Sequence, residues 1–277
     1  MLHWIFPATR QCSELIECYW FIEKTTSQRE SFPKLNPDPC AHLILAPTSE
    51  PYSYTFDGVV YSGCGSHLLF AHQETTQLDH SKPFVHLGIK LHPSAIYRLA
   101  LKPDNAEVLD NVKEIDILSL LGVRESVLKR LLKLARHEPL QCVSELEHHL
   151  ASWVVSAKHD QHSKLTDKVV RALESTPIAN LDATLHCSQR TIERSFRRVT
   201  DLTLKQYQAM TKLELMLEYL YQRPSSEIDW VDVAYQFGFS DQPHLIRYLK
   251  KQIGTTPQKY VSQRGFTIDV YGGVSSE

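Results

Sequence analysis

The sequence lacks any long apolar run, which bears on membrane association. Its longest apolar runs, such as residues 118–123, are far shorter than the ~18–20 residues that a membrane-spanning helix needs. The opening residues, MLHWIFPATRQCSEL, have no basic region ahead of their apolar stretch, unlike a secretory signal. We therefore expect a cytoplasmic protein without a membrane partner.

Cysteine is also sparse. The chain has 6 cysteines in 277 residues, too few and too scattered for the disulfide framework of a small secreted domain. We expect them to be reduced thiols. An apolar content of 42% with 22% charged residues excludes disordered, collagen-like and coiled-coil chains, and the length fits about two domains.

Common catalytic motifs are absent from the sequence. It has no nucleophile elbow, phosphate-binding loop or dinucleotide fingerprint, so nothing in it supports an enzyme or a bound cofactor. Two close pairs, Cys40 with His42 and Cys64 with His67, have the chemistry of zinc ligands. Neither pair has the Cys-x-x-Cys spacing of structural zinc sites. We predict no metal, and the sequence alone leaves open whether these four residues bind one.

The net charge of −2 conceals an uneven distribution. Residues 1–162 hold 15 basic and 19 acidic side chains, whereas residues 163–265 hold 15 basic and 11 acidic ones. The last twelve residues hold two acidic side chains and no basic one. The basic excess thus belongs to one region, which indicates an anionic partner for that region alone.

Residues 1–104 have the pattern of short strands. Apolar runs such as 42–46, 52–56 and 85–91 are bounded by Pro, Gly, Ser and Asp, which predicts strands rather than long helices. We expect a β-rich, barrel-like or sandwich domain with a small helix near residues 12–20.

The rest of the chain has helical spacing. In residues 105–160 apolar positions recur three and four apart, as in amphipathic helices, and the polar stretch 158–164 is the predicted linker. Residues 161–265 continue the helical spacing with short turns, and residues 266–277 form a tail. The predicted fold class is α+β and multidomain, with a β-rich domain, a helical connector and an all-α C-terminal domain.

An internal repeat lies within residues 161–265. A shift of 53 residues places residues 192–207 over residues 245–260, so one supersecondary unit occurs twice. The matched pairs include Arg194 with Arg247, Phe196 with Leu249, Thr203 with Thr256 and Tyr207 with Tyr260.

Each copy has the layout of a helix-turn-helix followed by a further helix. In the second copy, residues 231–237 predict a short helix, Gly238 suits a left-handed turn, and Ser240 or Asp241 caps a helix that ends near residue 253. In the first copy, the predicted cap of the long helix is Ser188. Thr203 and Gln206 there fit a capping box for the helix that follows.

The long helix of each copy has an apolar face and a basic face. At 100° per residue, apolar residues such as Leu245, Leu249 and Ile253 form one stripe. The side chains that point outward are Arg190, Arg194, Arg197 and Arg198 in the first copy, with Glu193 on one flank, and His244, Arg247, Lys250 and Lys251 in the second. A single such helix is explained by a solvated charged face. Two copies at a fixed offset, each after a short helix and a tight turn, favour DNA binding.

Residues 230–260, with the sequence WVDVAYQFGFSDQPHLIRYLKKQIGTTPQKY, closely resemble the signature of the AraC/XylS family of bacterial transcription regulators. Residues 188–208 resemble the matching part of the first helix-turn-helix of that family. The first unit also departs from the family pattern. The departures are Asp182 and Met216 where Ala is usual, Asp201 where Gly is usual, Leu204 for a common Pro and Lys212 for a frequent Arg.

The resemblance implies that one long helix, residues 202–221, joins two recognition helices that enter successive major-groove segments on one side of the DNA. Carried over by position, the base-facing residues are Arg190, Glu193 and Arg194 in the first unit and Gln242, His244 and Arg247 in the second. Arginine binds guanine, glutamine binds adenine, and glutamate accepts from cytosine. The expected phosphate contacts are Ser188, Arg197, Lys250 and Lys251, and for Arg198 either role or neither is left open.

The N-terminal part resembles, less closely, the sensory domains of such regulators. The resemblance is to a subgroup with a Tyr19–Trp20 pair and a Pro-Asp segment, residues 37–39, before an apolar strand. Aromatic residues are concentrated here and suit an apolar effector pocket. Our candidate pocket residues are Trp20, Asp38 and His42, and core packing is the alternative for each.

The connector helices suit an intermolecular antiparallel pair. The apolar residues with the right spacing are Leu128, Leu131, Leu132, Ala135, Leu146, Leu150 and Val154. Packing onto the chain's own β domain is the alternative. We favour a homodimer, because one DNA-binding module of this type reads only a limited site.

These observations predict a cytoplasmic, AraC-type transcription regulator that is not an enzyme. Its expected partners are double-stranded DNA and RNA polymerase, and family habit favours an activator. The N-terminal domain senses an unidentified effector or mediates dimerisation. The alternative is a small-molecule-binding or enzymatic β domain with a C-terminal helical interaction module.

Overall fold

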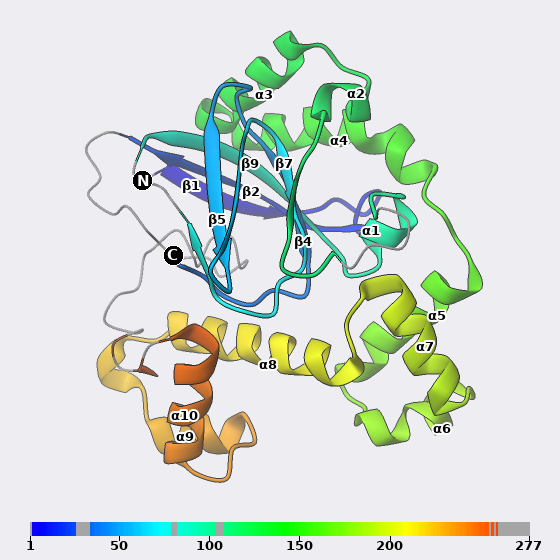
Figure 1. Cartoon of the computed structure of the whole chain (residues 1–277), viewed down its shortest axis with the longest axis vertical. Helices are drawn as coiled ribbons and strands as arrows, with labels where there is room; N and C mark the ends of the chain where they lie inside the picture. The colour runs from blue at the N-terminus through cyan, green and yellow to red at the C-terminus, as the bar shows by residue number, and fades with distance from the viewer. Residues whose placement is uncertain are drawn as a thin grey trace.

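Two antiparallel sheets and a set of helices make up the N-terminal part of the protein, and helices alone make up the C-terminal part (Figure 1). The computed structural model describes residues 2–25, 34–78, 82–102 and 108–254, together with residues 256, 257 and 259. The α+β class predicted from the sequence is confirmed. Within these residues, no helix is both long enough and apolar enough to cross a membrane.

The first sheet has six strands in the order β1-β2-β9-β4-β7-β10, and the second has four in the order β3-β8-β5-β6. The strands of the first sheet are β1 (Leu2–Pro7), β2 (Ile16–Lys24), β9 (Phe84–Leu91), β4 (Ala41–Leu45), β7 (His67–Leu69) and β10 (Val112–Glu114). Those of the second are β3 (Lys34–Leu35), β8 (Thr76–Leu78), β5 (Pro51–Phe56) and β6 (Val59–Cys64). The strands expected at 42–46, 52–56 and 85–91 are confirmed. Strand β10 comes from the segment expected to be a helical connector.

The helix expected near residues 12–20 is wrong, because most of that stretch belongs to strand β2. The side chains of β2 alternate between two hydrophobic cores. Tyr19 and Phe21 pack under the helices, whereas Trp20 and Ile22 pack against the second sheet. Both faces of the strand are therefore buried, and its continuous apolar run mimics the pattern of a buried helix.

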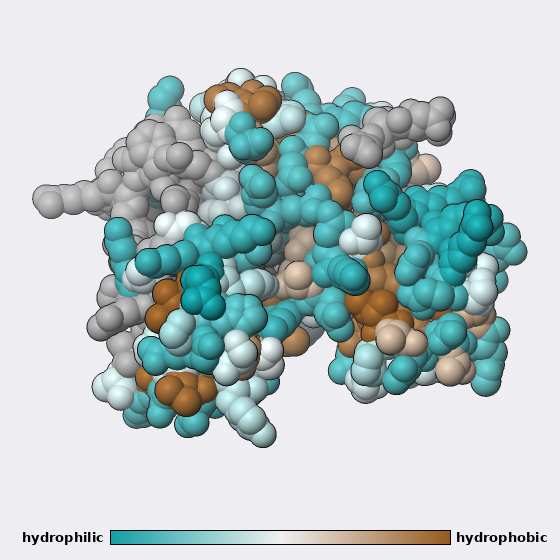
Figure 2. Space-filling model, turned by 60° about the horizontal axis from the view of Figure 1, so that its bottom comes forward, coloured by the Kyte–Doolittle hydropathy of each residue, from teal (hydrophilic) through white to brown (hydrophobic). Residues whose placement is uncertain are grey.

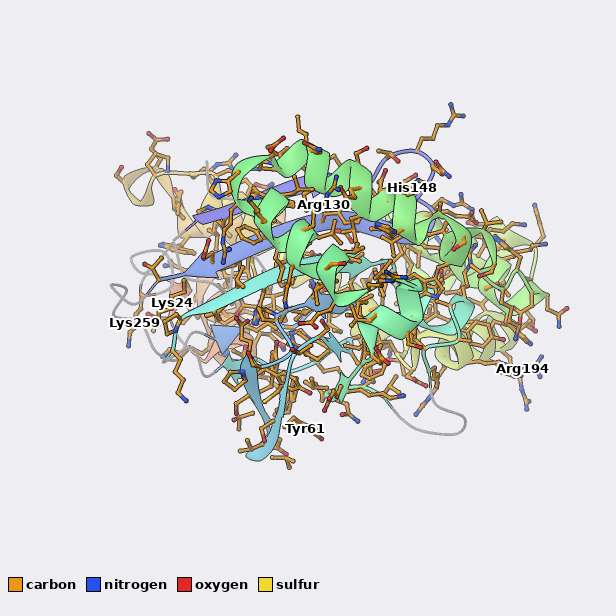
Figure 3. All side chains as sticks on the ribbon, turned by 90° about the horizontal axis from the view of Figure 1, so that it is seen from above. Lys24, Tyr61, Arg130, His148, Arg194 and Lys259 are labelled. Atoms are coloured by element: carbon orange, nitrogen blue, oxygen red, sulfur yellow. The ribbon has the colours of Figure 1, made fainter. Side chains whose placement is uncertain are left out.

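Four helices cover the outer face of the six-stranded sheet: α1 (Ala95–Arg98), α2 (Ile117–Leu121), α3 (Glu125–His137) and α4 (Pro139–Val155). Seen from above, α3 and α4 lie across the sheet and carry Arg130 and His148 on the viewer's side (Figure 3). The apolar residues expected to form an intermolecular helix pair, from Leu128 to Val154, are buried or half-buried in the core of this same domain. The structure therefore assigns these side chains to packing within the chain.

The C-terminal part consists of α5 (Gln161–Leu173), η1 (Ile178–Asn180), α6 (Leu181–Leu185), α7 (Gln189–Thr200), α8 (Leu204–Tyr221), η2 (Ser225–Glu227), α9 (Trp230–Gln236) and α10 (Gln242–Ile253). The long helix α8 joins one unit around α5–α7 to a second unit around α9–α10 (Figure 1). The stretch expected as a linker, 158–164, is partly helical, because Asp160 caps α5 through the backbone amides of His162 and Ser163.

The predicted helix ends are confirmed in both units. Ser188 caps α7, and Thr203 with Gln206 forms the capping box of α8. In the second unit Asp241, rather than Ser240, caps α10. Gly238 has the positive φ expected of the turn, at 64°.

Glycine at position 88 is required by the packing between the sheets. Gly88 on β9 lies directly opposite Trp20 on β2, and a Cβ atom added at Gly88 would lie 1.9 Å from Cε2 of the indole. The absent side chain thus leaves room for the fully buried Trp20. The indole ring fills the space that any other residue at position 88 would occupy.

We predict that Gly88→Ala lowers the free energy of unfolding by about 1–3 kcal/mol or more, because overpacking a core costs about that much. Urea titration followed by circular dichroism measures the change. Val60→Ala is the control, since Val60 is 62% exposed on β6 and exposed substitutions change stability by less than about 0.5 kcal/mol. Equal stability of the two variants would contradict the packing described for Trp20.

Candidate DNA interface

The two long helices of the repeat, α7 and α10, turn their apolar sides inward. Ile192, Phe196 and Val199 of α7 are buried in the core of the first unit. Leu245, Leu249 and Ile253 of α10 are buried in the core of the second. The stripes predicted from the sequence are thus confirmed, and the opposite side of each helix faces solvent.

The predicted DNA-contacting residues lie on these outer sides. The exposed ones are Ser188, Arg190, Glu193, Arg194, Arg197, Arg198, His244, Arg247, Lys250 and Lys251, and Gln242 is half-buried at the start of α10. Arg194 extends from the edge of the molecule, away from α3 and α4 (Figure 3). Each helix therefore presents its predicted contact residues on one accessible face.

The basic charges on these faces are not neutralised by neighbouring carboxylates. Among the described residues, no ion pair joins an acidic group to Arg190, Arg194, Arg197, Arg198, Arg247, Lys250 or Lys251. Glu193 lies beside these arginines but accepts a hydrogen bond of 2.8 Å from Nε2 of Gln189. Guanidinium and ammonium groups that are not paired with carboxylates can donate hydrogen bonds to phosphate oxygens and to the edges of guanine bases.

Short contacts fix each recognition helix to its neighbours. His162 Nδ1 on α5 lies 3.0 Å from Oγ of Ser195 on α7. The hydroxyl of Tyr248 on α10 donates to the carbonyl of Ala209 on α8 at 2.9 Å. Asp241 accepts from the backbone amide of His244 at 2.6 Å and so fixes the first turn of α10. Apolar residues of α8 also belong to the cores of both units, so α8 supports both.

Two grooves lie beside the recognition helices. The first, of about 640 Å³, runs along α7 and is lined by Arg190, Arg194, Arg197, Arg198 and Lys205 among others. The second, of about 730 Å³, lies between the two units and is lined by Lys205, Lys212, His244 and Tyr248 among others. Lys205 borders both grooves. Figure 2 shows this side, where mostly hydrophilic residues cover two lobes and the surface is hollowed between them.

Lys205 and Lys212 are DNA-contacting candidates in addition to those expected from the sequence, which predicts only a connecting role for the long helix. Their spacing of seven residues places both on one side of α8. Nζ of Lys212 lies 3.9 Å from the centroid of the Phe239 ring, and burial lowers the pKa of this lysine. The repeat of a lysine after seven residues in the long helix was the sequence signal that could have identified both as DNA-contacting candidates.

The candidate effector residues of the N-terminal domain lie close together, and their polar groups are hydrogen-bonded to one another. Trp20 Nε1 donates to Nδ1 of His42 at 3.0 Å, and Nε2 of His42 lies 3.0 Å from Oδ2 of Asp38. All three side chains are fully buried. Asp38 also faces the ammonium group of Lys90 at 3.5 Å, so the three residues form a continuous polar chain that leads to a buried cation.

The four residues considered for zinc have other surroundings. His67 is bonded to the hydroxyl of Tyr54 at 2.7 Å, and burial lowers its pKa to about 3. Cys64 is exposed on β6, whereas Cys40 and His42 are buried beside Asp38. Within the described part of the chain, no group of three or more His, Cys, Asp or Glu side chains is placed to hold a metal ion.

Comparison with known families agrees with this geometry. Residues 181–263 match the family of helix-turn-helix domains, a span that begins at α6 and includes both recognition helices. The C-terminal part of the chain is thus a helix-turn-helix domain of the AraC type. Residues 5–111 match a domain of unknown function (DUF6597). No curated protein matches the chain in sequence.

The chain is similar to several solved structures at low sequence identity. A single-residue variant of apo ToxT from Vibrio cholerae is 10% identical, with a TM-score of 0.50 over 89% of this chain and 98% of ToxT. A second ToxT structure from Vibrio cholerae is 10% identical, with a TM-score of 0.47 over 87% and 97%. The AraC-like transcriptional activator CuxR is 10% identical, with a TM-score of 0.28 over 79% and 87%.

We predict that Lys212→Met weakens binding to all DNA sequences alike. A lost phosphate contact lowers the slope of log affinity against log salt by about 0.9, and the methionine still packs against Phe239. Fluorescence anisotropy at several salt concentrations measures the slope. Lys133→Met is the control, because Lys133 is exposed on the distant helix α3. A slope equal to that of the unmodified protein would remove Lys212 from the interface.

Proposed function

We propose that this protein is an AraC-type transcription regulator that binds a bipartite operator, with α7 and α10 in successive major-groove segments on one face of the DNA. The observation that carries the proposal is the pair of basic, unneutralised helix faces held on one helix, α8. Two recognition helices that enter one side of the duplex approach segments about one helical turn apart. The groove between the units then lies opposite the intervening DNA.

Base recognition is proposed for the residues near the start of each recognition helix. In α7 these are Arg190, Glu193 and Arg194, and in α10 they are Gln242, His244 and Arg247. Arginine binds O6 and N7 of guanine together, glutamine pairs with adenine, and glutamate accepts from N4 of cytosine. Their positions near the N-terminal ends suit helices that enter the major groove end-first.

Phosphate contact is proposed for residues beside or beyond these positions. They are Ser188 at the cap of α7, Arg197 along that helix, and Lys250 and Lys251 in the last turn of α10. The grooves add Lys205 and Lys212 on α8. These contacts would give affinity and orientation without selecting a sequence.

The biological setting is part of the same proposal. We propose that the protein acts in the cytoplasm as a non-enzymatic activator that contacts RNA polymerase, and that its N-terminal domain responds to an effector. Trp20, Asp38 and His42 are the proposed effector contacts, and because they are fully buried, an effector must open the packing around them. A homodimer would use surfaces other than the buried faces of α3 and α4.

Selection of bound sequences from a random duplex pool, with the full chain at near-physiological salt, tests the function. Enrichment of two boxes about one helical turn apart supports the proposal. Enrichment of a single box would contradict simultaneous use of α7 and α10. Absence of any enrichment would contradict DNA recognition by the chain in its free state.

We predict that Arg247→Ala and Lys251→Ala have different effects on DNA binding, because the first changes sequence preference and the second changes only affinity. Loss of a bidentate base contact by Arg247→Ala costs about 1–3 kcal/mol and relaxes the preference at one base pair. Loss of a phosphate contact by Lys251→Ala weakens binding to selected and scrambled duplexes by the same factor. Affinities for the selected site and its single-base variants measure both effects. Sequence-independent losses from both substitutions would overturn the assignment.

A further inference from the structure

The β domain touches both helix-turn-helix units and the helix between them. The ammonium group of Lys102 pairs with Asp201 just after α7, and that of Lys90 pairs with Glu214 on α8. Gln206 on α8 donates to the side chain of Gln73. Thr75 donates to the carbonyl of Gln252 on α10. One surface of the β domain thus contacts the end of α7, the middle of α8 and the end of α10.

Lys90 is the most deeply buried charge in this contact. It lies on the central strand β9, where it pairs in register with Cys18 of β2 and His42 of β4, and its side chain is fully buried. Glu17 and Asp38 of the β domain approach its ammonium group at 3.2 and 3.5 Å. Glu17 occupies an irregularity in the β2–β9 pairing, and such bulges redirect side chains.

Glu214 contacts Lys90 from the other domain. A buried ammonium group is costly unless its charge is paired and its protons are donated to acceptors. Among the described residues, Glu17 and Asp38 of the β domain and Glu214 of α8 all approach this ammonium group. Docking of α8 against the sheets therefore gives the buried Lys90 an acceptor from the other domain.

The contact at Asp201 explains an unusual residue. Asp201 has a left-handed backbone, with φ of 61°, at the repeat position where the second unit has Gly254 with φ of 67°. A residue with a side chain adopts this conformation at a cost that glycine avoids. Only a side chain at this position reaches Lys102. The departure from glycine thus provides a bond to the β domain.

The contacts with the β domain leave the grooves free. On α8, Gln206 and Glu214 face the β domain, whereas Lys205 and Lys212 line the grooves. At 100° per residue the two pairs are centred roughly 150° apart. In Figure 1 the sheets lie on one side of α8, and the recognition helices keep their basic sides exposed.

We propose that the β domain is a brace that fixes the spacing of the two recognition helices, with Glu214 and Asp201 as positioning residues held by Lys90 and Lys102. The inference rests on the proposed binding of a bipartite operator and names what sets its spacing. With α7, α8 and α10 each held by the β domain, the distance between the two recognition helices is constant. The protein then favours operators whose two boxes have one particular separation. Released from the brace, α8 alone joins the two units, and the chain tolerates other separations.

The test uses the full chain and two duplexes, one with the selected boxes and one with a single base pair inserted between them. Glu214→Arg places a second cation against Lys90 and disrupts the brace. Helix α8 still folds in this variant, because the arginine is exposed to solvent once the β domain is released. We expect the affinity ratio between the duplexes to fall roughly tenfold, within the usual range of coupling between sites. Glu218→Arg is the matched control, since Glu218 is exposed one turn further along α8.

Asp201→Gly separates positioning from folding. Glycine suits the left-handed conformation better than aspartate does, so the variant keeps or gains stability in thermal unfolding while it loses the bond to Lys102. We expect the affinity ratio to fall roughly threefold, a smaller coupling than that of the buried pair. Retention of the full ratio by both Glu214→Arg and Asp201→Gly would overturn the brace. Failure of the unmodified chain to bind either duplex would instead contradict the proposed function.

The brace has an expected pH dependence through Glu214. Burial raises the pKa of this carboxyl to about 7, and Asp38 and Glu17 add to the rise although Lys90 opposes it. Exposed in an undocked chain, the group returns toward its ordinary value of 4.5. At pH values between 4.5 and about 7, docking of the β domain onto α8 therefore takes up a proton at Glu214. Docking is strongest at the lower end of this pH range and weakens as the pH rises through about 7.

We predict that the affinity ratio between the two duplexes is larger at pH 6 than at pH 8. Glu214→Gln, which is neutral at both pH values and still accepts from Lys90, keeps a high ratio at both. Histidines at the DNA interface act on both duplexes alike and cancel in the ratio. An equal pH response in Glu214→Gln and in the unmodified chain would contradict the role of Glu214.

Discussion

The arrangement of the molecule depends on one buried cation. Lys90 lies on the central strand of the six-stranded sheet, and its partners come from the β domain and from the helix that joins the two DNA-binding units. Because an unpaired ammonium group is poorly tolerated in a protein interior, this single side chain links the fold of the β domain to the placement of α8. The positions of α7 and α10 then follow from their contacts with α8 and with the surrounding surface of the β domain.

The two sides of α8 have separate tasks. One side is acidic and amide-bearing and meets the β domain, and the other is basic and lines the grooves between the recognition helices. A chain of hydrogen bonds from Trp20 through His42 and Asp38 ends at Lys90. A change of packing between the two sheets would thus act first on Lys90, whose ammonium group contacts α8. Such a path offers an effector a physical route to the DNA-binding units, provided that it favours one docking arrangement over the other.

The sequence predicted the C-terminal domain well, because its signals are local. Caps at Ser188, Thr203 and Asp241, the glycine turn at Gly238 and the apolar stripes act over a few residues and repeat at a fixed offset. The N-terminal part was predicted only as β-rich. Strand β2 was assigned in part to a helix, because burial on both faces removes the alternation that marks a strand. The apolar faces of α3 and α4 were assigned to a dimer, since a sequence pattern shows that a face is buried but not by which partner. The pairs of Lys90 with Glu214 and of Lys102 with Asp201 join residues 124 and 99 positions apart, and no local pattern reveals them.

Hydroxyl-radical footprinting of the full chain on its selected operator is the direct test of two-site binding, because it maps both units on the DNA at once. We expect two protected segments on one face of the duplex, about one helical turn apart, in a complex where the β domain remains docked. Protection of one short segment, or of two segments on opposite faces, would contradict an interface in which α7 and α10 are held together on α8.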